Sequence, residues 1–162
     1  MSIPPSSRLL LVHLAVAFAV CSCAGKYVQP TSGPTATVTF TTTERTPQTT
    51  VFTFDSRKCD NVKAVGSVVH VEGRPDVGRL VAKVSADVEY ITTFRMLMNG
   101  YITISCYSTV AFQPKSGEDY KLTFDYDAIG RVCRSQIGRW DSTTSSFVRP
   151  EEASFSPPSC KF

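Results

Sequence analysis

Four cysteines in the body of the chain, Cys59, Cys106, Cys133 and Cys160, have the spacing that bears most directly on chemistry. Successive members are 47, 27 and 27 positions apart. A zinc site built from four cysteines uses close pairs, with about two to four residues between ligands, and these cysteines form no such pair. An even number of well-separated cysteines is typical of disulfides in an exported chain. We therefore expect two disulfide bonds and no metal site.

His70 is the histidine that could serve as a general base for a nucleophile in the body of the chain. It stands between Val69 and Val71, and the alternation predicts a mid-strand residue that faces solvent. The motifs G-x-S-x-G, H-E-x-x-H and the P-loop are absent. Asp125–Gly130 matches a calcium loop only in part, because Ile129 fills an acidic position, and we interpret it as a turn. The sequence predicts no enzyme, no cofactor and no catalytic site.

An apolar run at the N-terminus, Leu9–Val20, follows the single charge Arg8. The run is too short for a transmembrane helix, which needs about 20 residues, and it matches the apolar region of a signal peptide, about 7–15 residues. A buried core helix is the less favoured alternative, because Ser-, Pro- and Gly-rich sequence follows the run. We predict a signal peptide over residues 1–22.

The run ends in Val20-Cys21-Ser22-Cys23, which resembles the lipobox of bacterial lipoproteins. The resemblance implies that Cys23 is the lipid acceptor and becomes the first residue of the mature chain, carrying a diacylglycerol and often a third acyl chain. Ala24 after the acceptor, in place of Asp, implies sorting to the outer membrane in a host that has one. The alternative is ordinary signal-peptidase cleavage after Ala24, which would release a soluble secreted protein.

A second resemblance lies in Phe112-x-Pro114-x-x-Gly117-x-x-Tyr120, which has a cysteine before it and one after it. This pattern is similar to one in small uncharacterised bacterial envelope lipoproteins. Its physical sense is a strand end, a Pro/Gly loop and the start of another strand. The resemblance implies an envelope lipoprotein and brings no catalytic residues.

Charge gives no argument for nucleic acid as a partner. The chain has 17 basic and 14 acidic residues, and removal of Arg8 with the signal peptide leaves a net charge of +2. The basic residues are scattered, with no run of four or more. A nucleic-acid-binding domain typically shows a basic stripe or patch.

Apolar and polar residues alternate with a period of two through most of the remaining chain. After a flexible Pro/Gly/Ser/Thr-rich tether over residues 23–36, we expect a domain over residues 37–162. Asn99-Gly100 between two extended runs predicts a hairpin turn. The fold class expected is all-β: an antiparallel β-sandwich, immunoglobulin-like or similar, of about 7–8 strands stapled by two disulfides. The strands expected cover residues 37–42, 50–54, 65–72, 80–90 (one bent strand or two short ones), 92–98, 101–112, 120–127 and 131–138.

The cysteine pairing depends on how these strands meet. If residues 101–112, 120–127 and 131–138 form an antiparallel meander, Cys106 and Cys133 lie two strand steps apart, about 9–10 Å. A disulfide requires Cα atoms within about 7 Å, so this meander excludes a Cys106–Cys133 bond. Cys59–Cys106 with Cys133–Cys160 is preferred because it closes shorter loops. Cys59–Cys133 with Cys106–Cys160 stays open.

The function predicted from the sequence is a lipid-anchored β-sandwich protein of the cell envelope with a structural or partner-binding role. Its partners would be the membrane, through the lipid on Cys23, and an envelope protein, with no nucleic acid. It would lie at the outer membrane, on the periplasmic face or the cell surface. The alternative is a soluble secreted binding module.

Overall fold

The structure is a computed structural model that describes residues 24–44, 46, 48–74, 78–98, 103–151 and 160. These residues form ten β-strands and no helix, so none of them belongs to a helix that could cross a membrane. The predicted all-β class is confirmed, with more strands than the 7–8 expected. In chain order the strands are β1 Gly25–Lys26, β2 Thr35–Thr42, β3 Thr49–Phe54, β4 Lys63–Val68, β5 Leu80–Ser85, β6 Tyr90–Met98, β7 Ile104–Phe112, β8 Asp119–Asp127, β9 Val132–Asp141 and β10 Ser146–Val148.

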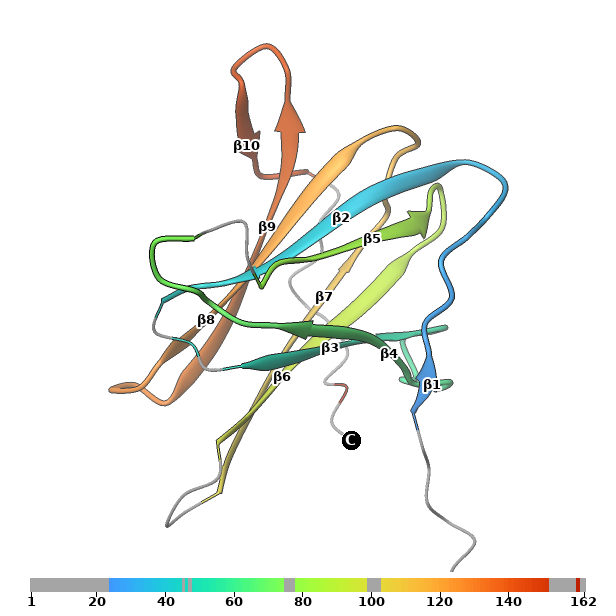
Figure 1. Ribbon diagram of the computed structural model, residues 1–162. Coiled ribbons are helices and arrows are strands. Elements are labelled where there is room, and N and C mark those ends of the chain that lie inside the picture. The colour runs from blue at the N-terminus through green and yellow to red at the C-terminus, as the bar shows by residue number, and fades with distance from the viewer. Residues whose placement is uncertain are drawn as a thin grey trace, which may run out of the picture.

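The strands form two five-stranded sheets that make the layers of a β-sandwich (Figure 1). Sheet A has the order β1-β4-β3-β6-β7, and sheet B has the order β10-β9-β8-β2-β5. Two of the pairings, β1 with β4 and β2 with β8, are parallel, and the others are antiparallel. The order differs from that of a constant-type immunoglobulin domain, whose third, sixth and seventh strands share a sheet. Counted from β2, the third and sixth strands here lie in sheet A and the seventh lies in sheet B.

Alternation along the strands builds the core between the two sheets. On β8, Tyr120, Leu122, Phe124 and Tyr126 are buried, as the period of two predicts. The centroid of the Phe94 ring in sheet A lies 5.8 Å from that of Phe40 and 5.3 Å from that of Phe124, both in sheet B. Aromatic contacts of this kind supply much of the apolar area that a sandwich buries.

The long alternation over residues 80–90 is split between the two sheets. Strand β5 ends at Ser85 in sheet B, and β6 begins at Tyr90 in sheet A. The connection passes through Asp87, which has a positive φ of 64°. This turn takes Val88 out of the core, and it is 56% exposed although the alternation predicted an inward position. Neither alternative for residues 80–90 is right: the range holds one short strand, β5, and a turn, and its last residue begins the nine-residue β6, which also covers the predicted strand 92–98.

The predicted hairpin between the sixth and seventh strands is confirmed by its pairing. Strands β6 and β7 run antiparallel with Met98 opposite Ile104 and Tyr90 opposite Phe112. The turn residues Asn99-Gly100 lie outside the described residues, so the turn type stays a prediction.

The predicted meander and the preferred disulfides are wrong. Strand β7 pairs with β6 in sheet A, whereas β8 and β9 form a hairpin in sheet B. The chain therefore changes sheets between Phe112 and Asp119, and Cys106 faces Cys133 across the sandwich rather than across a strand. The bonds are Cys106–Cys133 and Cys59–Cys160, with Cα–Cα distances of 6.0 and 5.4 Å. This is the pairing that the assumed meander excluded.

The segment predicted to be a flexible tether is held against the sandwich. Gly25–Lys26 forms β1 beside β4, and the Tyr27 N–H donates to the Ala64 carbonyl at 2.9 Å. The Tyr27 hydroxyl donates to the Lys83 carbonyl, and the Lys83 N–H donates to Gln29 Oε1, at 2.9 and 3.1 Å. These bonds reach from the edge of sheet A to β5 at the edge of sheet B. The composition predicts a flexible segment, but backbone pairing with β4 and side-chain hydrogen bonds of Tyr27 and Gln29 to β5 order residues 25–29.

Candidate functional site

The predicted site residues fall into two groups. Cys23, the predicted lipid acceptor, lies outside the described residues. Cys59, Cys106, Cys133 and Cys160 are all bonded, so none is a free thiol. Cys59 and Cys160 also join a small apolar cluster that is separate from the main core and contains Phe52, Phe54, Ile91 and Ala111. The cysteines are structural, and a site must be sought among other residues.

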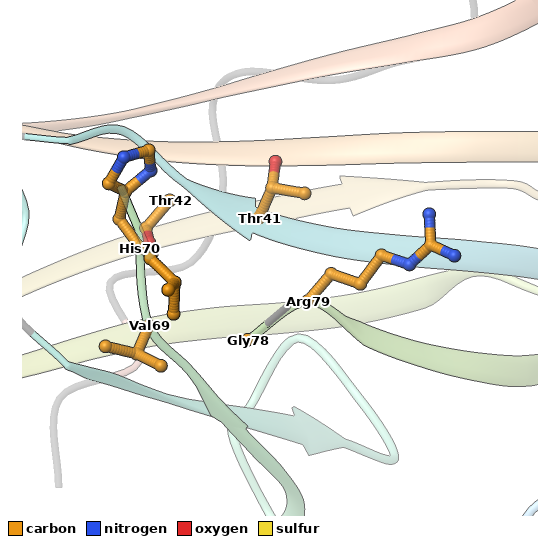
Figure 2. A pocket seen from close by; sticks show the side chains of 7 residues that line it. Thr41, Thr42, Val69, His70, Gly78 and Arg79 are labelled. Carbon is orange, nitrogen blue, oxygen red and sulfur yellow. The ribbon is translucent and has the colours of Figure 1, made fainter. Parts of the chain in front are cut away.

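His70 lines a small pocket beyond the end of β4, not a strand as predicted (Figure 2). Its volume is about 20 Å³, room for about one water molecule. The described lining supplies the Thr41 and Thr42 hydroxyls but no carboxylate to orient the imidazole. Arg79 extends away from His70 in Figure 2. The pocket therefore lacks the described acid–base partners of a nucleophilic site.

The backbone beside His70 closes tightly at Gly78. The Val69 N–H donates to the Gly78 carbonyl at 3.0 Å, and Gly78 has a φ of +82°. A Cβ at Gly78 would lie 2.1 Å from the Val69 carbonyl oxygen. Glycine is needed here for both reasons, and this contact ties the start of β5 to the end of β4.

A larger cleft, of about 450 Å³, opens beside the N-terminal segment. Volumes of about 300–1,000 Å³ are typical of small-molecule sites. Residues far apart in the sequence meet here because β3, β4, β5 and β6 all end or begin at this cleft. Its walls are the N-terminal segment (Tyr27, Val28, Pro30), the end of β3 (Thr53, Phe54, Asp55), the start of β4 (Lys63) and the β5–β6 connection (Ser85, Val88, Glu89, Tyr90).

Two ion pairs make the cleft polar without giving it a net charge. Lys63 Nζ donates to Asp55 Oδ1 at 2.5 Å, and Asn61 Nδ2 donates to the other carboxylate oxygen at 3.1 Å. Arg57 Nε donates to both Glu89 oxygens, at 2.9 and 3.0 Å. Lys63 holds the pKa of Asp55 below its usual value, and Arg57 does the same for the pKa of Glu89. Both carboxylates are therefore ionised at neutral pH and available as hydrogen-bond acceptors.

Tyr90 contributes a buried hydroxyl beneath the cleft. Its side chain is 7% exposed, its phenol oxygen is not accessible to solvent, and the Thr53 and Thr92 hydroxyls lie close enough to lower its pKa. The neighbouring Thr53 and Thr92 hydroxyls donate to the carbonyls of Ile91 and Phe52. Burial, with a smaller effect of Tyr27, raises the pKa of Tyr90, so the phenol stays neutral at physiological pH.

An exposed aromatic pair forms a second surface feature. Trp140 and Phe147, 40% and 45% exposed, meet edge to face at 5.2 Å between ring centroids. They lie on the β9–β10 hairpin, which projects beyond the rest of the sandwich (Figure 1). Lys121 Nζ lies 5.9 Å from the Phe147 centroid, and a Cβ at Gly138 would lie 2.8 Å from Phe147 Cβ. The pair is packed on its own sheet and lines no cavity described here.

The chain was compared with family models, with curated proteins and with solved structures, and none of the three comparisons finds a match. Among the described residues, no group of three or more His, Cys, Asp and Glu side chains gathers in a way that could hold a metal ion.

Sequence reasoning missed the cleft and its residues. By the alternation, Glu89 belongs to a solvated strand face, and the polar run Asp55–Asn61 indicates only a loop. One sequence feature could have indicated the cleft: three charged residues in Asp55-Ser56-Arg57-Lys58 stand directly before Cys59. A disulfide at Cys59 holds this loop in place, so its charged side chains have fixed positions.

Proposed function

We propose that the chain is a lipid-anchored protein of the cell envelope whose β-sandwich is a binding module. The observation that carries this proposal is the path of the N-terminal segment. Strand β1 begins at Gly25, two positions after the proposed lipid acceptor Cys23, and residues 25–29 are hydrogen-bonded to both sheets. A lipid on Cys23 would therefore hold this edge of the sandwich, with its cleft, close to a membrane surface.

The anchor itself follows from the chemistry of acyl chains. Each buried CH₂ contributes about 0.8 kcal/mol, and one chain gives only marginal membrane binding. A diacylglycerol on Cys23 would give stable attachment. The two disulfides are consistent with an oxidising compartment such as the periplasm or the cell surface.

A binding role is favoured over catalysis by what surrounds the candidate groups. His70 lines a pocket of water size whose described lining has no carboxylate. The cleft beside the N-terminal segment has the volume of a ligand site, but its described lining contains neither histidine nor cysteine. A partner in the envelope, or a small ligand, suits these features better than a reaction does.

The second candidate is a soluble secreted binding module, released by cleavage after Ala24. The observation that favours it is that residues 25–29 are integrated into the fold, so the sandwich needs no lipid to order its N-terminal segment. The cleft would then face solvent freely.

Detergent phase separation of the protein expressed in a diderm bacterium tests the anchor. We expect the wild-type protein in the detergent phase and the Cys23→Ala variant in the aqueous phase. The matched control is Cys21→Ala, which removes a cysteine from the predicted signal peptide and should leave the protein in the detergent phase. A wild-type protein in the aqueous phase would establish the secreted alternative.

A further inference from the structure

We propose that the free edge of β5 is a pairing site for a second copy of this chain, and that Tyr27 and Gln29 hold this edge closed. Strand β5 is the last strand of sheet B, and among the described strands it pairs with β2 alone. An edge strand presents backbone groups that can pair with a strand of another chain. The pairing depends neither on the lipid at Cys23 nor on a ligand in the cleft.

Lys83 shows which backbone groups of β5 face the free edge. Its N–H donates to Gln29 Oε1 at 3.1 Å, and its carbonyl accepts from the Tyr27 hydroxyl at 2.9 Å. Both backbone groups of Lys83 therefore point away from β2. Because the direction of these groups alternates along a strand, those of Val81 and Ser85 point the same way. The two side chains thus occupy the middle of the free edge.

The N-terminal segment covers this edge with side chains and does not extend sheet B. Its backbone pairs with β4, through β1 and the Tyr27 N–H, so it is not available to β5. Pro30 follows Gln29 and has no N–H to give to a ladder. Lys83 is exposed, and an exposed lysine on an edge strand is a further device against strand addition. The fold therefore protects the β5 edge in two ways.

Few contacts hold the cover, so it can leave while the sandwich stays folded. Strand β1 has two residues, Tyr27 is half-buried at the margin of the core, and Gln29 is exposed. The connection to β2 contains Pro30, Gly33 with a φ of +82°, and Pro34. Local opening of such a segment costs less free energy than global unfolding.

A second copy of β5 fits the uncovered edge in an antiparallel register. A two-fold axis at Ala82 sets Val81 of one copy opposite Lys83 of the other, so the two lysines do not face each other directly. Val81 is exposed, and the aliphatic stem of the opposite lysine gives it an apolar contact. The pairing joins two five-stranded sheets into one sheet of ten strands.

Sedimentation velocity on the lipid-free mature chain, residues 24–162, tests the pairing. We expect the wild-type chain to be monomeric and Tyr27→Ala/Gln29→Ala to dimerise. Its association constant should rise at least about tenfold, because the edge is open in only a small fraction of wild-type molecules. The matched control is Lys26→Ala/Val28→Ala, which changes two exposed side chains of the same segment and should leave the chain monomeric.

Lys83→Pro, added to the double variant, tests where the contact lies. Proline removes the N–H that faces the free edge and leaves the pairing with β2, so it should return the chain to the monomer. Amide hydrogen exchange gives a direct check of opening. At a concentration where Tyr27→Ala/Gln29→Ala is monomeric, its Lys83 amide should exchange at least about tenfold faster than in the wild-type chain.

The proposal is overturned if the wild-type chain already dimerises, if Tyr27→Ala/Gln29→Ala stays monomeric, or if Lys83→Pro does not reverse its association. An unchanged exchange rate at Lys83 would equally show that these side chains do not close the edge. If the double variant fails to fold, as judged by circular dichroism, Gln29→Ala alone decides, because Gln29 is exposed. The chain carries no lipid in these measurements, so their failure leaves the proposed anchor untouched.

Discussion

The two disulfides should stabilise the fold unequally, because they close loops of different length. Cys59–Cys160 spans 101 positions and Cys106–Cys133 spans 27. The chain-entropy relation gives about 4.7 kcal/mol for the longer loop and about 3.6 kcal/mol for the shorter one at 25 °C. The double variant Cys59→Ala/Cys160→Ala should therefore lose about 1 kcal/mol more unfolding free energy than Cys106→Ala/Cys133→Ala.

Urea unfolding at 25 °C, followed by tryptophan fluorescence and circular dichroism, measures the loss of unfolding free energy in each double variant. Single variants provide the control on pairing: Cys106→Ala should free one thiol, at Cys133, and Cys59→Ala should free the thiol of Cys160. A larger loss of unfolding free energy without the Cys106–Cys133 bond than without the Cys59–Cys160 bond, or a free Cys59 thiol in Cys106→Ala, would contradict this prediction.

Three further perturbations follow from the fold. Phe94→Ala removes a fully buried ring between two others and should cost about 3–5 kcal/mol in a urea titration; a loss below 1 kcal/mol would contradict the packing. Gly78→Ala should lower the urea midpoint well below that of Gly73→Ala, since both glycines have positive φ but only at Gly78 would a Cβ strike backbone; equal midpoints would contradict this. Stability should fall as the pH drops from about 5 through the lowered pKa of Glu89, because protonation ends its pairing with Arg57. Glu89→Gln should flatten that acid limb, and an unchanged pH profile would show that the pair contributes nothing.

The sequence predicted which side chains face the core better than it predicted which sheet each strand joins. Alternation on β8 identified Tyr120, Leu122, Phe124 and Tyr126 as inward, and all four are buried. The inner faces of both sheets look onto one core, so the same pattern fits either sheet. Nothing in the alternation marks the crossing between Phe112 and Asp119, and the disulfide assignment failed for that reason.

Two departures have local physical causes. The run over residues 80–90 continues its alternation through Asp87, but the left-handed backbone there redirects the chain and exposes Val88. The Pro/Gly/Ser/Thr-rich N-terminal segment has no apolar pattern. It is ordered by hydrogen bonds to edge strands, and such bonds use backbone groups that every composition supplies.

The cleft could not have been predicted from spacing. It joins Tyr27, Asp55, Lys63 and Glu89. The β3–β4 pairing brings Asp55 beside Lys63, and Tyr27 joins them because the segment after β1 reaches β5 of the other sheet. A buried tyrosine in an alternating run is an ordinary core residue by pattern. Tyr90 is such a residue, and its position beneath the cleft is a property of the fold.

Export and lipid anchoring of this chain are tested by the intact mass of the mature protein from a diderm bacterial host. We expect a chain that begins at Cys23 and carries a diacylglycerol, with or without a third acyl chain, less the four hydrogens lost in forming two disulfides. A mass that begins at Gly25 with no acyl group would contradict the anchor and favour the secreted form.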